Sequence, residues 1–291
     1  MNTWVWYFAS GRSIWAGLAL MSLASLLYLL RSENCLRRSA AIVYLGGIIL
    51  VYLSTTPLTL FVTLLIWSLT FTWALSILIR LKASKFKLAL FFGTIGIAVI
   101  TAFLELPFQR IPSIPKLQFE SIYVVGDSVS SGIGGPAETA WPKRLEEHLG
   151  RPVINLAIAG ATAQTALQRQ LPKITHNNSL VFLEIGGNDL LNGTAPKDYE
   201  AVLSNLLEEL TQQNHTIVWF ELPRLLWHQQ QGRIQRQLSQ KYSVILIPRI
   251  FLADIFEGKE LTSDAIHLTQ RGHDVFAKKV FALFEGSRDD H

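Results

Sequence analysis

Long apolar stretches fill most of the first third of the chain and set it apart from the remainder. Each is free of Asp, Glu, Lys, Arg and His in its core. A helix needs about 20 apolar residues to cross a bilayer, and the second and fourth stretches lie at the short end of that range. We predict a helical membrane domain over residues 1–106, with about four spans at residues 13–30, 39–56, 57–79 and 88–104.

A secretory signal peptide is the alternative for the first stretch, because Arg12 precedes an apolar run. Three more such runs follow, and no small-residue cleavage site precedes Arg31, so a membrane helix is favoured. Ionisable residues at membrane depth usually mark an ion or proton path, and their absence argues against transport. We expect this part to be an anchor; presentation of a lipid or acyl group is the alternative.

After a proline-rich linker at residues 107–118, the hydrophobic pattern changes over residues 119–287. Short β-rich runs alternate with amphipathic helical patterns, which predicts a doubly wound parallel sheet with helices on both faces. In such sheets ligands bind at the carboxyl ends of the strands. The expected strands are Ser121–Val125, Val153–Ala157, Leu180–Ile185, Thr216–Phe220 and Val244–Ile247, and the expected helices are Trp141–Leu149, Ala163–Leu171, Asp198–Gln212 and Leu225–Lys241.

Charge is divided unevenly between the two parts. Up to Lys116 there are ten basic and two acidic residues, a net of +8; the remainder has 16 basic and 20 acidic residues, a net of −4. The net positive charge of the chain therefore comes from the predicted membrane part, and we expect no nucleic-acid binding. The only cysteine, Cys35, allows no intramolecular disulfide and says nothing about the redox compartment.

The positive charges also predict an orientation. Arg31, Arg37 and Arg38 fill the first loop, and Arg80, Lys82, Lys85 and Lys87 fill the third. With four spans these loops share the cytoplasmic side, so the N-terminus and everything after Leu106 lie outside the cytoplasm, with Trp4, Trp6 and Tyr7 at the outer interface. We expect a multi-pass protein of the cytoplasmic membrane with a periplasmic or extracellular catalytic domain. If the short second span does not cross, the sidedness reverses.

Candidate catalytic residues follow the predicted strands. Gly126-Asp127-Ser128 follows the first strand, Gly160 the second and Gly186-Gly187-Asn188-Asp189 the third; Asp264-Ala265-Ile266-His267 precedes a further helix expected from Thr269. Acyl transfer needs a nucleophile, a base, a group that orients the base, and N–H donors for the oxyanion. Taken singly, each string has a plain alternative as a turn or a helix cap. Together they supply every group that the reaction needs.

Other polar residues give no competing site. Asp and His can bind metals, but no further ligand cluster with metal spacing accompanies Asp264 and His267, so no metal is expected. The run Gly132–Ala137 has only a faint likeness to a dinucleotide loop, and Pro136 argues against it. Five other histidines are interpreted as surface residues: His148, His176, His215, His228 and His273.

These motifs, in this order, resemble the SGNH, or GDSL-type, hydrolase family over roughly Ser121–Phe284. The four strings match its four signature blocks, with Val129 in place of the leucine that often follows the serine. The third and fourth blocks look most similar to the bacterial thioesterase/lysophospholipase branch, in which the membrane part has no counterpart.

The resemblance implies a three-layer α/β/α, flavodoxin-like fold with a five-stranded parallel sheet and no cofactor. It also implies Ser128 as nucleophile, His267 as base and Asp264 as its orienting partner. The oxyanion hole would be the Ser128 N–H, the Gly160 N–H and the Asn188 side chain.

We therefore predict a membrane-anchored serine esterase that acts on a carboxylic ester, either a lysophospholipid or other lipid, or an O-acylated envelope glycan. Cytosolic acyl-CoA is disfavoured by the predicted orientation. Two alternatives stay open: an O-acyltransferase that acts on envelope polysaccharide, and a non-catalytic membrane binding module. The sequence indicates no protein partner.

Overall fold

The computed structural model describes residues 3–30, 34–79, 83–115, 119–133, 138–224, 226–258 and 260–285. The chain divides into two compact units. One contains residues 1–6, 110–223 and 230–291, and the other contains residues 7–109 and 224–229. The division between the units after Gln109 lies three residues beyond the predicted end of the membrane domain. Arg31, Arg80, Lys82, Lys116 and Gly134–Ala137, which the sequence interpretation used, lie outside the described residues.

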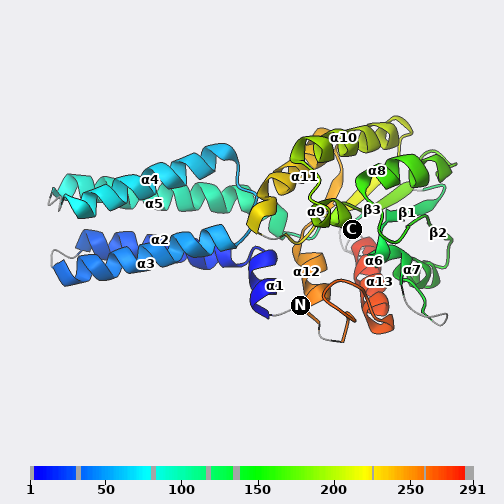
Figure 1. Cartoon of the computed structure of the whole chain (residues 1–291), viewed down its shortest axis with the longest axis horizontal. Helices are drawn as coiled ribbons and strands as arrows, with labels where there is room; N and C mark the ends of the chain where they lie inside the picture. Colours follow the sequence, from blue (N-terminus) through cyan, green and yellow to red (C-terminus); the bar gives the residue numbers. More distant parts are fainter. Residues whose placement is uncertain are drawn as a thin grey trace. The chain divides into compact units, whose positions relative to one another are not determined.

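The helical unit consists mainly of four long helices, drawn in blue to cyan in Figure 1. They are α2 (Ser13–Leu30), α3 (Asn34–Leu53), α4 (Leu60–Leu78) and α5 (Ser84–Glu105), preceded by α1 (Thr3–Ala9) and followed by the 3-10 turn η1 (Leu106–Gln109). Within the described residues, three segments are long and apolar enough to cross a membrane: Ser13–Leu30, Leu60–Leu78 and Ser84–Gln109. In α3 the apolar part is shorter, Arg38–Leu53.

Two glycines allow α2 and α3 to pack with their backbones almost in contact. A Cβ atom added to Gly17 would lie 2.7 Å from the Gly47 carbonyl oxygen, and one added to Gly47 would lie 2.8 Å from that of Gly17. Real Cβ atoms do not approach backbone so closely, so only glycine fits at this crossing. A Cβ atom added to Gly46, the neighbour of Gly47, would point into open space, with no other atom within 4 Å.

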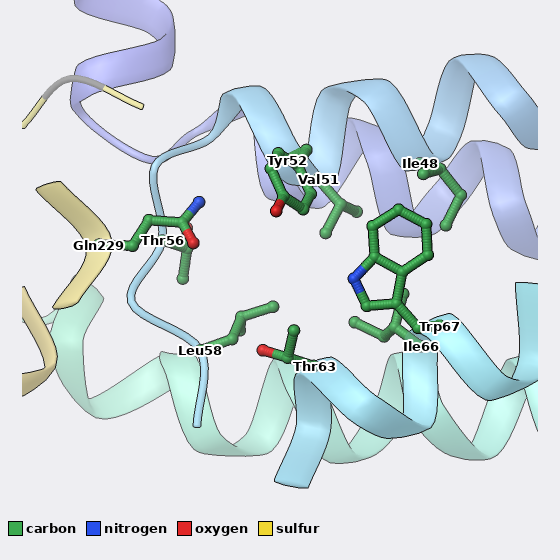
Figure 2. A pocket seen from close by; sticks show the side chains of 9 residues that line it. All are labelled: Ile48, Val51, Tyr52, Thr56, Leu58, Thr63, Ile66, Trp67 and Gln229. Atoms are coloured by element: carbon green, nitrogen blue, oxygen red, sulfur yellow. The ribbon is translucent and has the colours of Figure 1, made fainter. Parts of the chain in front are cut away.

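The helical unit has a small cavity beside α3 and α4, which Figure 2 shows. Its volume is about 30 Å³, and apolar side chains such as Ile48, Val51 and Trp67 line most of it. A site of this size holds a water molecule or two.

The other unit contains a five-stranded sheet in the order β2-β1-β3-β4-β5, with every neighbouring pair parallel. The strands are β1 (Ile122–Gly126), β2 (Val153–Asn155), β3 (Leu180–Glu184), β4 (Thr216–Phe220) and β5 (Ile245–Ile247). This is the flavodoxin-like strand order, so the predicted α/β fold with a parallel five-stranded sheet is confirmed. The order reverses at β1, between β2 and β3, where ligands of such folds bind.

Helices cover both faces of the sheet (Figure 1). On one face lie α7 (Trp141–Leu149), α12 (Ile250–Glu257) and α13 (Gln270–Glu285); on the other lie α8 (Ala163–Thr165), α10 (Pro196–Gln212) and α11 (Gln229–Lys241). Alternate strand residues point to opposite faces, as in Val181 and Phe182 of β3. The strands therefore read as continuous apolar runs because both faces are buried.

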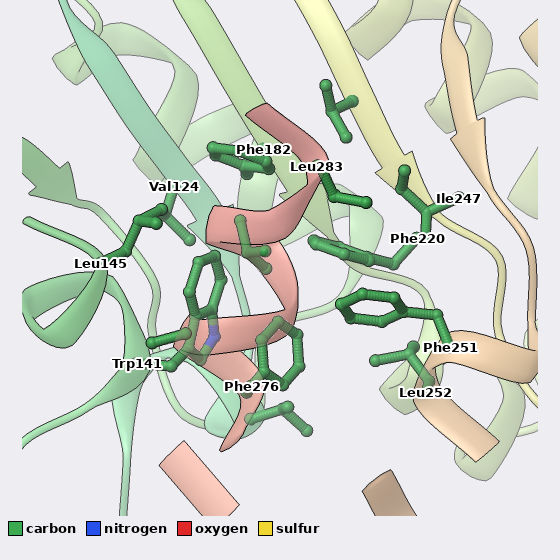
Figure 3. Close-up of a cluster of buried hydrophobic side chains, with 14 of the residues drawn as sticks. Val124, Trp141, Leu145, Phe182, Phe220, Ile247, Phe251, Leu252, Phe276 and Leu283 are labelled. Carbon is green, nitrogen blue, oxygen red and sulfur yellow. The ribbon is translucent and has the colours of Figure 1, made fainter. Parts of the chain in front are cut away.

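Aromatic side chains fill the core on the α13 face, as Figure 3 shows. Trp141 stacks on Phe276 with ring centroids 4.6 Å apart, and each of these rings makes a T-shaped contact with Phe220. The same Trp141 donates its indole N–H to Ser130. Packing on this face thus reaches the turn that follows β1.

Several element boundaries differ from the sequence prediction. The helix expected at Ala163–Leu171 is divided into α8, a π-helical turn at Ala166–Gln170 and a 3-10 turn at Leu171–Lys173. The helix expected from Leu225 begins at Gln229, after the turn Leu226–His228. Helix α12 was not predicted. The linker is also partly packed: the Ile114 N–H donates to the Leu283 carbonyl at 2.8 Å, and the Ile114 side chain is buried.

Candidate active site

Ser128 lies directly after the carboxyl end of β1, at the first position of the short helix α6 (Ser128–Ser131). Asp127 is the N-cap residue, and its Oδ1 accepts the Val129 N–H at 3.0 Å. Gly126 allows this sharp turn, since a Cβ there would lie 2.8 Å from Ser130 and 3.1 Å from the Glu184 carbonyl. The buried Gln170 side chain binds both the N–H and the carbonyl of Gly126 at 2.9 Å. The half-buried Ser128 is therefore fixed by its neighbours.

Gly160 lies in the loop that follows β2, and Asn188 lies in the short helix α9 (Gly187–Leu191) that follows β3. The Asn188 Nδ2 atom donates to Asp127 Oδ2 and to the Ala161 carbonyl, at 3.0 Å in both cases. These bonds bring the first three sequence motifs together at one edge of the sheet. Within the described part of the chain, no protein acceptor is bound by the backbone N–H of Ser128 or of Gly160.

Asp264 and His267 form a directly bonded pair in the loop before α13. The His267 Nδ1 atom is 2.6 Å from Asp264 Oδ2, and Asp264 Oδ1 accepts the backbone N–H groups of Ile266 and His267 at 2.8 Å each. The His267 hydrogen bond, followed by these backbone bonds, holds the pKa of Asp264 well below its usual range. Ionised Asp264 therefore keeps the proton of neutral His267 on Nδ1 and leaves Nε2 as an acceptor.

The loop is closed by an antiparallel bridge between Thr262 and Leu268 and by the Ser263 N–H, which donates to the His267 carbonyl at 2.9 Å. At the start of α13, directly after this loop, Gln270 accepts the Thr139 N–H at 2.8 Å and His273 accepts the Trp141 N–H, so the loop lies beside the segment that follows α6. The fourth motif thus lies at the same edge of the sheet as the others.

The structure adds an acid that the sequence interpretation missed. Glu184, the last residue of β3, has its Oε2 atom 2.9 Å from the Ser130 hydroxyl and 3.3 Å from the Asp127 N–H. It was counted as part of an apolar strand. A glutamate at the end of a strand buried on both faces is the signal that could have identified it.

Two histidines interpreted as surface residues are buried, which corrects that prediction. His273 accepts the Trp141 backbone N–H at Nδ1 and donates from Nε2 to Glu138, and burial lowers its pKa. His215 accepts the Ser179 N–H and is 8% exposed. Both serve packing between elements. Among the described residues, no group of three or more His, Cys, Asp or Glu side chains is arranged to bind a metal ion.

A family model supports the assignment that this geometry suggests. The model of the GDSL-like Lipase/Acylhydrolase family matches residues 124–275, which include Ser128, Gly160, Asn188, Asp264 and His267.

Relatives of known activity are similar over the same part. Thioesterase 1/protease 1/lysophospholipase L1 of Escherichia coli strain K12 is 28% identical over 158 residues, which cover 51% of this chain and 75% of the relative. An arylesterase of Vibrio mimicus is 34% identical over 110 residues, which cover 35% of this chain and 54% of the relative.

Among solved structures, a crystal structure of TesA aligns with 58% of this chain and 99% of its own, at a TM-score of 0.51 and 23% identity. This likeness supports the fold. The family match and the esterase relatives support a hydrolase that acts on ester bonds. The chain belongs to the GDSL-like lipase/acylhydrolase family.

Proposed function

We propose that this chain is a membrane-anchored serine esterase in which Ser128 attacks the carbonyl of a carboxylic ester. The bond of 2.6 Å between His267 and Asp264, on a loop at the same edge of the sheet as Ser128, is the observation that best supports it. His267 takes the Ser128 proton during attack and then returns it to the leaving alcohol. Water, activated by the same imidazole, releases the acyl group.

The oxyanion would be stabilised by three donors: the N–H groups of Ser128 and Gly160 and the amide of Asn188. Both hydrogens of that amide are engaged in the free protein, by Asp127 and by the Ala161 carbonyl. A negatively charged oxyanion can displace the neutral Ala161 carbonyl, because charge-assisted hydrogen bonds are about twice as strong as neutral ones. The bond to Asp127 then keeps the amide in place during the reaction.

The helical unit is proposed as the anchor, and its charge pattern favours an extracytoplasmic esterase domain. A contact inside the esterase unit supports an even number of crossings: the Trp6 indole N–H donates to Asp254 Oδ1 at 3.2 Å. Trp6 precedes the four long helices and Asp254 follows them, so both ends of the helical segment lie on one side. This supports a crossing by α3 despite its short apolar part.

The proposed substrate is an ester of the cell envelope, either a lysophospholipid or another lipid, or an O-acylated glycan. A membrane anchor would keep the esterase domain in the compartment where such esters are concentrated, and the predicted orientation separates it from cytosolic acyl-CoA. No structural feature favours transfer of the acyl group to a sugar over its transfer to water.

Turnover of a p-nitrophenyl ester by the full chain in detergent tests the proposal. We expect Ser128→Ala to abolish turnover, whereas Ser131→Ala, which removes a half-buried hydroxyl that donates to the Gly132 carbonyl in the same turn, keeps it. Activity of Ser128→Ala close to that of the unaltered protein would contradict the assignment. Addition of a glycan acceptor tests the transferase alternative, since a transferase would form acylated glycan at the expense of free acid.

A further inference from the structure

Three buried carboxyl groups belong to the segments that carry the candidate oxyanion donors, or to the strand before them. Asp127 and Asp189 are each 4% exposed, and Glu184 is 2% exposed. Their mutual electrostatic influence extends from Glu184 through Asp127 to Asp189. Negative charge at this position opposes the negative charge that develops in an ester-cleaving transition state. The protonation of these groups therefore matters for the reaction.

Glu184 has the environment of a neutral carboxylic acid. Its Oε2 accepts the Ser130 hydroxyl and the Asp127 N–H, and its carboxyl group is also hydrogen-bonded to the Asp127 side chain. Burial, and then the charge of Asp127, raise the pKa of Glu184 well above its usual value. Within the described residues, no Lys or Arg forms an ion pair with Asp127, Glu184 or Asp189.

Asp127 has the environment of the ionised partner. Its Oδ1 accepts the Val129 N–H and its Oδ2 accepts the Asn188 amide, so both oxygens act as acceptors. A hydrogen bond between this carboxylate and the Glu184 carboxyl needs one proton, which Glu184 supplies.

The groups that face the pair come from each element around it. Ser130 of helix α6 donates to Glu184 and accepts the indole N–H of Trp141 from α7. Helix α9 (Gly187–Leu191) contributes Asn188, which donates to Asp127, and the third acid, Asp189. The loop 262–268 contributes the imidazole of His267. Burial raises the pKa of Asp127, and its hydrogen bonds with Val129, Glu184 and Asn188 and a positive charge on His267 oppose this shift. Asp189 is engaged separately, because its Oδ2 accepts the Ala163 N–H at 2.8 Å.

We propose that Asp127 and Glu184 hold a single shared proton and act together as a positioning pair, in which neutral Glu184 fixes the Asp127 carboxylate that in turn orients the Asn188 amide. The proposal rests on the proposed esterase function, because it assigns Asn188 to the oxyanion site. Neither acid touches the substrate. Loss of the proton places a second negative charge against Asp127, which disturbs the Asn188 contact and repels the oxyanion.

The pair predicts opposite effects of two substitutions at one position. In Glu184→Gln the amide oxygen can accept from Ser130 and from the Asp127 N–H, while its NH₂ donates to the Asp127 carboxylate permanently. The pH profile of kcat/KM should therefore lose the decline on its alkaline side. In Glu184→Ala all three contacts are lost, and we expect kcat to fall about tenfold or more at every pH. Glu209→Gln, on the exposed side of α10, should follow the unaltered protein.

Stability gives a readout that does not depend on activity. An acid whose pKa is raised on folding is charged in the unfolded chain and neutral in the folded one, so its burial costs more stability as the pH rises above about 4.3. The Tm of Glu184→Gln should therefore exceed that of the unaltered protein by a margin that widens with pH. Asp127→Ala should reduce this margin, because it removes the charge that opposes ionisation of Glu184.

The deciding experiment combines pH–rate profiles with infrared spectra of the full chain in detergent. A carbonyl band of a protonated carboxylic acid that disappears in Glu184→Gln, with loss of the alkaline decline, is the expected result. A missing band, or an unchanged alkaline decline in Glu184→Gln, would overturn the shared proton. If the unaltered protein cleaves no ester, the proposed function fails, whereas the band and the Tm margin still decide the protonation of Glu184.

Discussion

Replacement of Asn188 by alanine separates a catalytic role of this side chain from a structural one. The substitution removes one of three proposed oxyanion donors, and loss of such a donor typically lowers kcat by about 10²–10³, which corresponds to roughly 2.7–4 kcal/mol. KM should change little, because the donor acts on charge that develops only in the transition state. A selective loss of kcat is therefore expected.

The same substitution also has a structural cost. Asp127 Oδ2 and the Ala161 carbonyl each lose a hydrogen bond of 3.0 Å. A buried acceptor left without its donor costs about 1–3 kcal/mol of unfolding free energy, so the Tm should fall as well. Because two carboxylate contacts of Asp127 remain, with Val129 and Glu184, we expect the fold to survive.

The assay is p-nitrophenyl ester hydrolysis in detergent, with kcat and KM normalised to folded protein, and with Tm measured on the same samples. Asn192→Ala is the matched control, since Asn192 is exposed and lies one helical turn after Asn188. It should retain both kcat and Tm. A lowered Tm with kcat within threefold of the unaltered protein would refute the reasoning, because Asn188 would then serve only the packing of the three loops.

Two further substitutions test other parts of the account. Asp264→Asn should lower kcat by roughly 10²–10⁴, because its NH₂ group faces His267 Nδ1 and forces the imidazole proton onto Nε2; an unchanged kcat at neutral pH would speak against His267 as the base. Gly47→Ala should lower the Tm of the full chain in detergent by an amount that reflects overpacking of about 1–3 kcal/mol. Gly46→Ala is its control and should leave the Tm nearly unchanged; equal effects of the two would contradict the close approach of α2 and α3.

The sequence predicted the sheet well because strands buried on both faces appear as short apolar runs. The expected run Thr216–Phe220 has the bounds of β4, and Trp141–Leu149 has the bounds of α7. The predicted helix ends differ from the observed ones where polar residues extend a helix beyond its apolar stretch. Helix α5 begins at Ser84, four residues before the predicted apolar stretch, since Lys85 and Lys87 are compatible with a helical turn.

Contacts between distant residues were beyond sequence reasoning. The positions of Ser128, Gly160 and Asn188 followed from the rule that parallel strands end at one edge of a sheet. The bonds of Asn188 to Asp127 and Ala161 did not, because they depend on how three loops meet. The buried partners of His273 were missed for the same reason: Glu138 and Trp141 lie more than 130 residues away along the chain.

Covalent labelling of the full chain with a fluorophosphonate tests the central claim most directly. The reagent reacts with a serine that is activated by a neighbouring base, and peptide mapping identifies the labelled residue. We predict one adduct per chain, on Ser128, that is absent in Ser128→Ala and greatly slowed when His267 is replaced by alanine. A chain that stays unlabelled, or an adduct on another serine, would contradict the assignment of Ser128 as the nucleophile.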